Sequence, residues 1–167
     1  MAADNPLAPA EQGKRACLEP DTQAKTCWTI ASYSKMADGI YQVTQKTGIR
    51  NTTDFEIRTI YITKLKDGQI CQTVEPDYLD NAKFYHMGDE MLRQDLANIR
   101  AIAAENMKNV IGKEVCMTLG AAAADGAQEF SVTIAGTPEK LDSNRHHKLL
   151  WVTPDDGYHL LRTQIEN

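Results

Sequence analysis

The sequence predicts an α+β domain in which a curved antiparallel sheet, with about seven or eight strands, packs around one long central helix. Three observations lead to this fold class. Apolar residues recur at steps of three and four from Asp89 to Gly112, which is typical of one face of a helix. On both sides of that segment they alternate with polar residues, as in strands. Asp-Gly pairs, which favour tight hairpin turns, begin at Asp38, Asp67, Asp125 and Asp156.

The chain length predicts one folded unit behind a short tail. At 167 residues, 42% of them hydrophobic, the chain can bury one ordinary core. Residues 1–16 are mainly polar and small and include Pro6 and Pro9, so we expect a loose N-terminal arm. Residues 17–167 are then a single α+β domain.

Before the helix, the alternation predicts two hairpins. The first joins the run that begins at Trp28 to the run from Tyr41 to Ile49, through Asp38-Gly39. The second joins Asp54–Leu65 to Gln69–Glu75. In Asp54–Leu65, Phe55 and Ile57 fall on one face of the strand, whereas Ile60 and Ile62 fall on the other. This change of face predicts a bulge or burial on both faces.

The helix itself is bounded by residues that favour its two ends. Asp89 can accept hydrogen bonds from the first turn, and Gly112 suits the left-handed conformation past the last turn. The preceding segment, Pro76–Met87, carries enough apolar surface for a short docked helix, with proline acceptable at its first position.

After the helix, the alternation predicts two more hairpins. Strands over residues 114–119 and 129–134 flank Asp125-Gly126, and a long polar loop, 136–147, follows them. Strands over residues 148–153 and 158–165, on either side of Asp156-Gly157, close the chain.

Four cysteines permit two disulfides with three possible connectivities. Cys17 and Cys27 can close a short loop that fastens the arm to the first strand. Cys71 and Cys116 are each out of phase with the apolar residues beside them, so both should point away from the main apolar face and could meet across neighbouring strands. The alternative is a cytosolic protein with four buried or free thiols.

Composition bears on compartment and partners. The first residues, Met1–Asp4 followed by a Pro/Ala-rich stretch, could be a processed secretory N-terminus, so we expect a periplasmic or secreted protein whose signal peptide has been removed. The 18 basic residues are outnumbered by 23 acidic ones and form no run, which argues against nucleic acid as a partner. No apolar run approaches the ~20 residues of a membrane helix, so we expect no membrane insertion.

Candidate chemistry is sparse. His86, Met87 and Met91 combine ligand types that suit copper, although methionine at helical spacing is more often part of a core. His146 and His147, at the end of the long loop, could bind a metal or an anion. No nucleotide-binding or catalytic motif is present, and no cofactor is expected.

We therefore expect a non-catalytic binding protein that holds a small apolar ligand, or a protein partner, on a helix-sheet scaffold. The ligand contacts would be aromatic: Trp28, Tyr41, Tyr61 and Trp151, with Tyr33 and Phe130 as further candidates. Each is equally suited to a core. Two alternatives remain open: an assembly subunit that pairs through a sheet edge such as Ile40–Thr47, and a small enzyme with His86 or His159 as general base.

Overall fold

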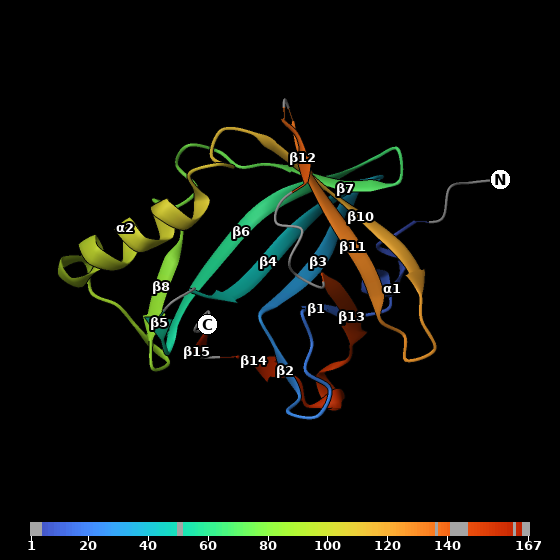
Figure 1. Cartoon of the computed structure of the whole chain (residues 1–167), viewed down its shortest axis with the longest axis horizontal. Helices are drawn as coiled ribbons and strands as arrows, with labels where there is room; N and C mark the ends of the chain where they lie inside the picture. Colours follow the sequence, from blue (N-terminus) through green and yellow to red (C-terminus); the bar gives the residue numbers. More distant parts are fainter. Residues whose placement is uncertain (1–4, 50–51, 136, 141–146, 162, 165–167) are drawn as a thin grey trace.

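The computed structural model describes residues 5–49, 52–135, 137–140, 147–161 and 163–164. Its main feature is an antiparallel sheet that closes on itself as a barrel of eight strands (Figure 1). Their order around the barrel is β1, β3, β4, β6, β7, β10, β11 and β13, and β13 pairs with β1 to complete the circle. Chain order and spatial order coincide, so this is an up-and-down barrel.

The barrel strands are β1 (Arg15–Leu18), β3 (Thr29–Ala37), β4 (Ile40–Gly48), β6 (Phe55–Lys66), β7 (Gln69–Thr73), β10 (Glu114–Ala122), β11 (Gln128–Ile134) and β13 (Lys148–Val152). The short strands are β2 (Thr26–Cys27), β5 (Thr52–Thr53), β8 (Lys83–His86), β9 (Asp89–Glu90), β12 (Thr137–Lys140), β14 (His159–Leu160) and β15 (Thr163–Gln164). The helices are α1 (Ala8–Glu11) and α2 (Leu96–Met107), with single 3₁₀ turns η1 (Arg93–Asp95) and η2 (Pro154–Asp156). Asp-Gly pairs form the turns of the β3–β4, β6–β7 and β10–β11 hairpins, and in each the glycine has a positive φ.

The predicted helix exists, but it is shorter than expected and is not central. Asp89 and Glu90 belong to β9, where they pair with β8, and α2 begins only at Leu96. Its buried residues, Ile99 and Ala103, pack against β6 and β8 through Ile57 and Phe84. The expected antiparallel sheet with a helix packed on it is confirmed. The central position is wrong, because the barrel fills its interior with its own side chains and α2 lies beside it (Figure 1).

Two further sequence predictions are wrong. The phase change in β6 produces no bulge, because its register with β4 runs without interruption from Lys64 to Glu56. Ile60 and Ile62 instead face outward, with 65% and 43% of their surface exposed. The segment 76–87 forms turns and β8 in place of a helix, because residues 83–86 pair with β6.

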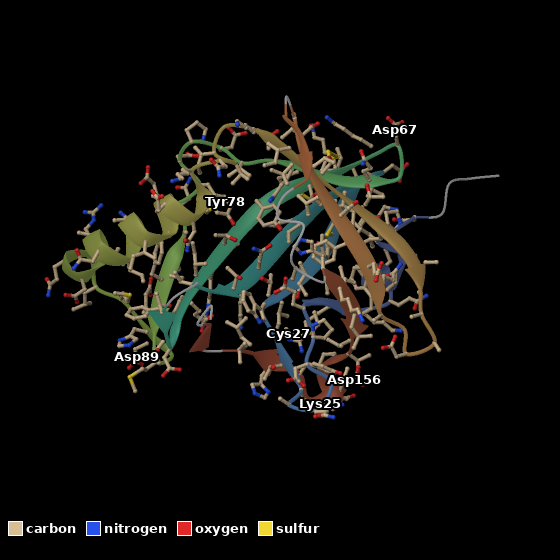
Figure 2. The ribbon with its side chains drawn as sticks, in the orientation of Figure 1. Lys25, Cys27, Asp67, Tyr78, Asp89 and Asp156 are labelled. Carbon is tan, nitrogen blue, oxygen red and sulfur yellow. A yellow bond between two sulfur atoms is a disulfide. The ribbon has the colours of Figure 1, made fainter. Side chains whose placement is uncertain are left out.

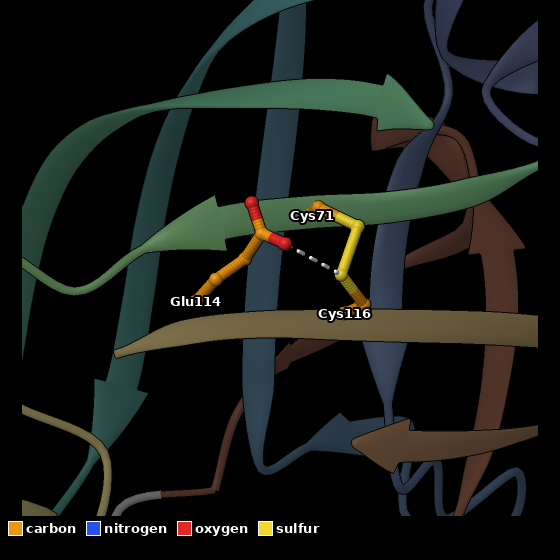
Figure 3. Close-up of side chains that lie close together, drawn as sticks. All are labelled: Cys71, Glu114 and Cys116. Carbon is orange, nitrogen blue, oxygen red and sulfur yellow. Dashed lines mark hydrogen bonds between the residues drawn. A yellow bond between two sulfur atoms is a disulfide. The ribbon is translucent and has the colours of Figure 1, made fainter. Parts of the chain in front are cut away.

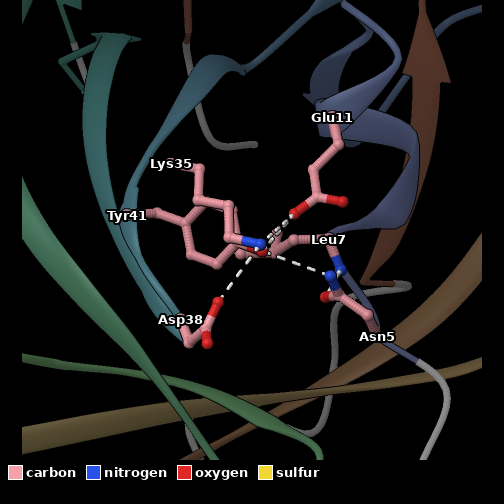
Figure 4. Close-up of polar contacts among 6 residues, drawn as sticks. All are labelled: Asn5, Leu7, Glu11, Lys35, Asp38 and Tyr41. Atoms are coloured by element: carbon pink, nitrogen blue, oxygen red, sulfur yellow. Dashed lines mark hydrogen bonds and ion pairs between the residues drawn. The ribbon is translucent and has the colours of Figure 1, made fainter.

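Residues 5–11, within the segment expected to be a loose arm, pack against one end of the barrel. Leu7 is fully buried and packs with Ala10 against Tyr41 and Ile70. Figure 4 shows Leu7 beside Tyr41 and the polar residues around them. The physical reason is that an open barrel end leaves apolar side chains in water, and Leu7 and α1 cover them. We call residues 5–11 the plug.

A polar network fastens the plug. The Tyr41 hydroxyl donates to Glu11 Oε1 over 2.9 Å and accepts from Asn5 Nδ2 over 3.2 Å. Lys35 Nζ lies 3.4 Å from the same Glu11 oxygen and 3.6 Å from Asp38 Oδ1. The hydrogen bond from Tyr41 is the main cause that lowers the pKa of Glu11, with Lys35 adding to it and burial opposing it.

This network predicts a pH dependence. Because the pKa of Glu11 is lowered in the folded state, its ionised form stabilises the fold above the ordinary glutamate pKa of about 4.3, and this stabilisation is lost as the pH falls through the lowered value. We expect Glu11→Gln to reduce the urea midpoint at pH 6, and we expect its deficit relative to the unsubstituted protein to shrink as the pH falls below the ordinary glutamate pKa. Asp80→Asn, at an exposed carboxylate away from the plug, is the control. An equal deficit for Glu11→Gln above and below that pKa would contradict the assignment.

Both disulfides are present and have the expected pairing. Cys17 is bonded to Cys27, and Cys71 to Cys116. Cys71 on β7 lies directly opposite Cys116 on β10, and the disulfide covalently links these two strands. Two disulfides indicate an oxidising compartment, since such bonds are rare where thiols are kept reduced.

Candidate functional site

The interior of the barrel, which we call the lumen, is lined by aromatic side chains from several strands. Tyr33 lies opposite Val43, which lies opposite Tyr61, so β3, β4 and β6 point these residues inward in one row. Trp151 is opposite Ala16, and this small side chain leaves room for the indole to approach Tyr33, with ring centroids 6.0 Å apart. The lumen is therefore a packed aromatic surface with small residues beside the rings.

The barrel wall is open between β6 and β7. β7 pairs with β6 only at residues 64–66, and β8 pairs with it only at residues 55–58. Within the described ranges, β6 has no partner on this side from residue 59 to residue 63. A cleft of about 470 Å³ lies here. Its walls come from β6, from β7 and from the connection between β7 and β8, and they include Thr59, Tyr61, Lys64, Gln72, Glu75, Asp77, Tyr78, Asn81 and Glu114.

The cleft reaches the lumen because several of its side chains face inward. Thr59 and Tyr61 belong to the inner face of β6, and Gln72 is in phase with Ile70 on β7. Tyr78, labelled in Figure 2, reaches β6 from the β7–β8 connection, where its hydroxyl donates to Thr59 Oγ1 over 3.0 Å. Its ring centroid is 6.3 Å from that of Tyr61. The two rings thus form the inner part of the cleft.

The phenols of this region are neutral over the whole physiological range. Burial raises the pKa of Tyr33 to about 12 and that of Tyr61 well above its ordinary value. Burial likewise raises the pKa of Tyr78, against the opposing effect of its bond to Thr59. Each hydroxyl can therefore donate a hydrogen bond without carrying charge.

The Gln72 amide, which lines the cleft, has no hydrogen-bond partner among the described residues. Other lumen groups are paired, since Tyr61 donates to Gln45 Oε1 over 2.6 Å and Trp151 Nε1 to Gln128 Oε1 over 3.1 Å. Polar groups inside proteins usually have partners. An unpaired amide in the wall of a cleft is what a ligand would engage.

The outer lip of the cleft is polar and covalently fixed. Lys66 Nζ lies 2.5 Å from Glu114 Oε2, and the other oxygen of Glu114 lies 3.8 Å from the sulfur of Cys116 (Figure 3). Cys71, Glu114 and Cys116 form the one cluster of three potential metal ligands among the described His, Cys, Asp and Glu residues. Because the two sulfurs are bonded to each other, they offer no thiolate that could bind a metal. The cluster is a disulfide with a glutamate side chain beside it.

The predicted ligand contacts fall in different places. Tyr61 and Trp151 both line the lumen, and Tyr61 also lines the cleft. Tyr41 faces the plugged end, where it is 1% exposed and bonded to Glu11. Trp28 lies between β2 and β3 and belongs to neither group of lumen residues. Composition alone could not separate these roles, because each requires knowing which strand face is inside.

The predicted metal ligands diverge. The His86 ring stacks on Phe55 with centroids 4.1 Å apart, and Met87 is 67% exposed in the β8–β9 turn, where its φ is 51°. Met91 packs toward the cluster around Phe84. Met87 and Met91 do not lie one helical turn apart, because β9 occupies the stretch between them.

The other histidines lie away from the cleft walls. His159 is exposed on β14 and lines a second, smaller cleft with Arg15, Lys46 and Tyr158. His147 lies next to Phe130, with Nδ1 3.6 Å from Glu19 Oε1. His146 lies outside the described residues.

Gln72, Thr59 and Tyr78 were missed by the sequence prediction. For Gln72 a signal existed: a glutamine in phase with Ile70 is a polar residue on the apolar face of a strand. Tyr78 had no such signal, because it lies on an irregular connection.

We compared the chain with protein-family models, curated proteins and solved structures. None of them matches. In the part of the chain that the structure describes, no helix has the length and apolar character needed to cross a membrane. Function must therefore be argued from the geometry of this site.

Proposed function

We propose that this is a periplasmic or secreted binding protein, without catalytic activity, that binds a small and mainly apolar ligand in the β6–β7 cleft, against the inward-facing rings that line it. One observation carries the proposal: the cleft in the barrel wall is lined by the rings of Tyr61 and Tyr78 beside the unpaired amide of Gln72. Barrels of eight strands are just large enough to hold one small ligand. Pockets of a few hundred Å³ lined by apolar rings and a few polar groups are typical ligand sites.

The compartment part of the proposal is supported by the two disulfides, which need oxidising conditions to form and persist. Catalysis is not part of it. His86 and His159, the two candidate bases, do not line the cleft.

A protein partner is a second candidate, supported by the exposed apolar residues Ile60, Ile62 and Met36 on the outside of the barrel. The edge expected at Ile40–Thr47 does not exist, because β4 is paired with β3 on one side and β6 on the other. An assembly would therefore have to use the outer face and not a free edge of β4.

Removing the Tyr61 ring is expected to weaken binding of a neutral apolar probe. With N-phenyl-1-naphthylamine, whose fluorescence rises in apolar surroundings, we expect Tyr61→Ala to raise Kd about tenfold or more, because the ring's buried contact area is lost. Tyr61→Phe, which keeps the ring, should bind within about twofold of the unsubstituted protein.

Met36→Ala is the matched control, since this exposed side chain lies outside the barrel. Thermal unfolding of each variant tells loss of binding apart from loss of fold. If Tyr61→Ala and Met36→Ala, both folded, bind the probe equally well, the β6–β7 cleft is not the binding site.

A further inference from the structure

We propose that the second, smaller cleft binds a small organic anion, and that Arg15 and Lys46 hold its carboxylate. This cleft has a volume of about 270 Å³. It shares no lining residue with the β6–β7 cleft, so the proposal goes beyond the binding function proposed above and does not depend on it.

The cleft forms where the short strand β14 lies against the outer face of the barrel. β14 pairs with β2 and contacts β3 and β4 (Figure 1). On β1, Ala16 packs in the lumen, so its neighbours Arg15 and Cys17 point outward. On β3, Ile30 packs with Cys17 and lies directly opposite Lys46 of β4. Arg15 and Lys46 therefore come from the two strands that flank β3, and Ile30 lies on the strand between them.

The Arg15 guanidinium has a hydrogen-bond donor without an acceptor. Its Nε atom is buried and forms no hydrogen bond. Buried polar groups in proteins usually have partners, so an unpaired one in the wall of a cleft points to a ligand. The N–H groups of a guanidinium form a planar fork that matches the two oxygens of a carboxylate. A bound carboxylate would accept from Nε and from a second N–H of the same side chain.

The charges of the lining favour an anion with one negative charge. Arg58 is already neutralised, because its Nε and Nη2 donate to the two oxygens of Glu56 over 2.9 Å and 3.1 Å. Arg15, Lys46 and Asp54 also line the cleft, and none of them forms an ion pair with a described residue. Two cations and one carboxylate leave one positive charge in excess, which a carboxylate ligand balances. A phosphate group, with close to two negative charges at pH 7, would exceed it.

The strand register gives an anion a further stabilising effect. Lys46 on β4 lies directly opposite Arg58 on β6, which in turn lies opposite Lys83 on β8. Like charges directly opposite each other in a sheet are destabilising. An anion bound beside Lys46 reduces this repulsion.

The organic part of the ligand is indicated by the rest of the lining. Four lining residues have apolar or aromatic side chains: Ile30, Phe55, Tyr158 and Leu160. Apolar ligand surface that packs against them leaves water, which is favourable. His159 also lines the cleft, and its ring N–H can donate to an anion. We therefore expect a small carboxylic acid with an apolar body.

Phenylacetate tests the proposal by isothermal titration calorimetry with the oxidised full chain. Phenylacetamide has nearly the same shape without the charge, and acetate has the charge without the ring. We expect phenylacetate to bind at least about tenfold more tightly than phenylacetamide, because hydrogen bonds to a charged group are the stronger ones. We expect acetate to bind at least about tenfold more weakly than phenylacetate, because it has no ring to bury. If phenylacetate does not bind, or if either other compound binds as tightly, the proposal is overturned, while the function proposed for the β6–β7 cleft stands.

Substitution of the two cations assigns the site. We expect Arg15→Gln to raise the Kd of phenylacetate about tenfold or more, since the fork is lost. Lys46→Gln should raise it about threefold, because water screens this exposed side chain. Lys113→Gln is the matched control, since Lys113 is exposed and lines neither cleft, and its Kd should not change. Equal binding by the folded Lys46 and Lys113 variants would overturn the assignment.

Asp54→Asn tests the site in the opposite direction. The substitution removes a carboxylate that repels a bound anion, so we expect the Kd of phenylacetate to fall about two- to threefold. Asp54 has a φ of 59°, a conformation that asparagine adopts readily, so the fold should be kept. Thermal unfolding checks this for every variant. Unchanged or weaker binding by folded Asp54→Asn would contradict the proposal.

Discussion

Reduction of the Cys71–Cys116 disulfide is expected to lower the free energy of unfolding by about 4 kcal/mol in the chain-entropy description. The two cysteines are separated by 45 positions, so the bond greatly restricts the unfolded chain. Cys17 and Cys27 are separated by 10, and their bond is expected to contribute about 3 kcal/mol. The bond across β7 and β10 should therefore matter more, and it also fixes one wall of the cleft.

Two double variants measure how much each disulfide contributes to stability. Each variant is compared with itself, oxidised and reduced, so the altered core does not enter the difference. Cys17→Ala with Cys27→Ala keeps only the longer link, and Cys71→Ala with Cys116→Ala keeps only the shorter one. Urea unfolding of each variant, oxidised and then reduced, gives the contribution of the remaining bond at constant sequence. A contribution from Cys71–Cys116 no larger than that from Cys17–Cys27 would show that loop length does not set their stabilities.

The hairpins could be predicted from sequence because their signals are local. An Asp-Gly pair between alternating runs fixes both the turn and the pairing of its two strands, as at Asp38-Gly39. The facing of Cys71 and Cys116 followed from the same alternation. Closure of the barrel could not be predicted, because β1 pairs with β13 across more than 100 residues and no local pattern indicates which distant strands meet.

The candidate site was predictable only in part, and for the same reason. Tyr61 and Trp151 could be named as aromatic candidates, but Tyr41 has the same residue type and is used to hold the plug. The cleft arises where β7 and β8 share β6 and leave a gap between them. Such a gap depends on where the pairing of β6 with β7 and the pairing of β6 with β8 end. Strand ends are set by tertiary contacts more than by the local strand preference of the residues.

Leu7→Ala is expected to lower the free energy of unfolding by about 3 kcal/mol, within the range of about 2–5 measured for buried leucines. Leu7 is fully buried and lies among Tyr41, Ile70 and Ala10 at the end of the barrel. Its removal takes away apolar contacts and leaves a cavity that the strands around it, held in a closed barrel, cannot easily fill. Urea unfolding followed by circular dichroism measures the loss.

Leu92→Ala is the matched control, because the same change is made at a side chain that is 62% exposed, and it should alter stability by less than about 0.5 kcal/mol. A loose arm would give two equal, small effects, since neither leucine would then be packed. A plug gives a large effect at Leu7 alone. Because Tyr41 and Glu11 join the plug to β4 through a hydrogen bond, Leu7→Ala should also reduce the pH dependence assigned to Glu11. The two effects are linked by one physical cause, the docking of residues 5–11 in the barrel end.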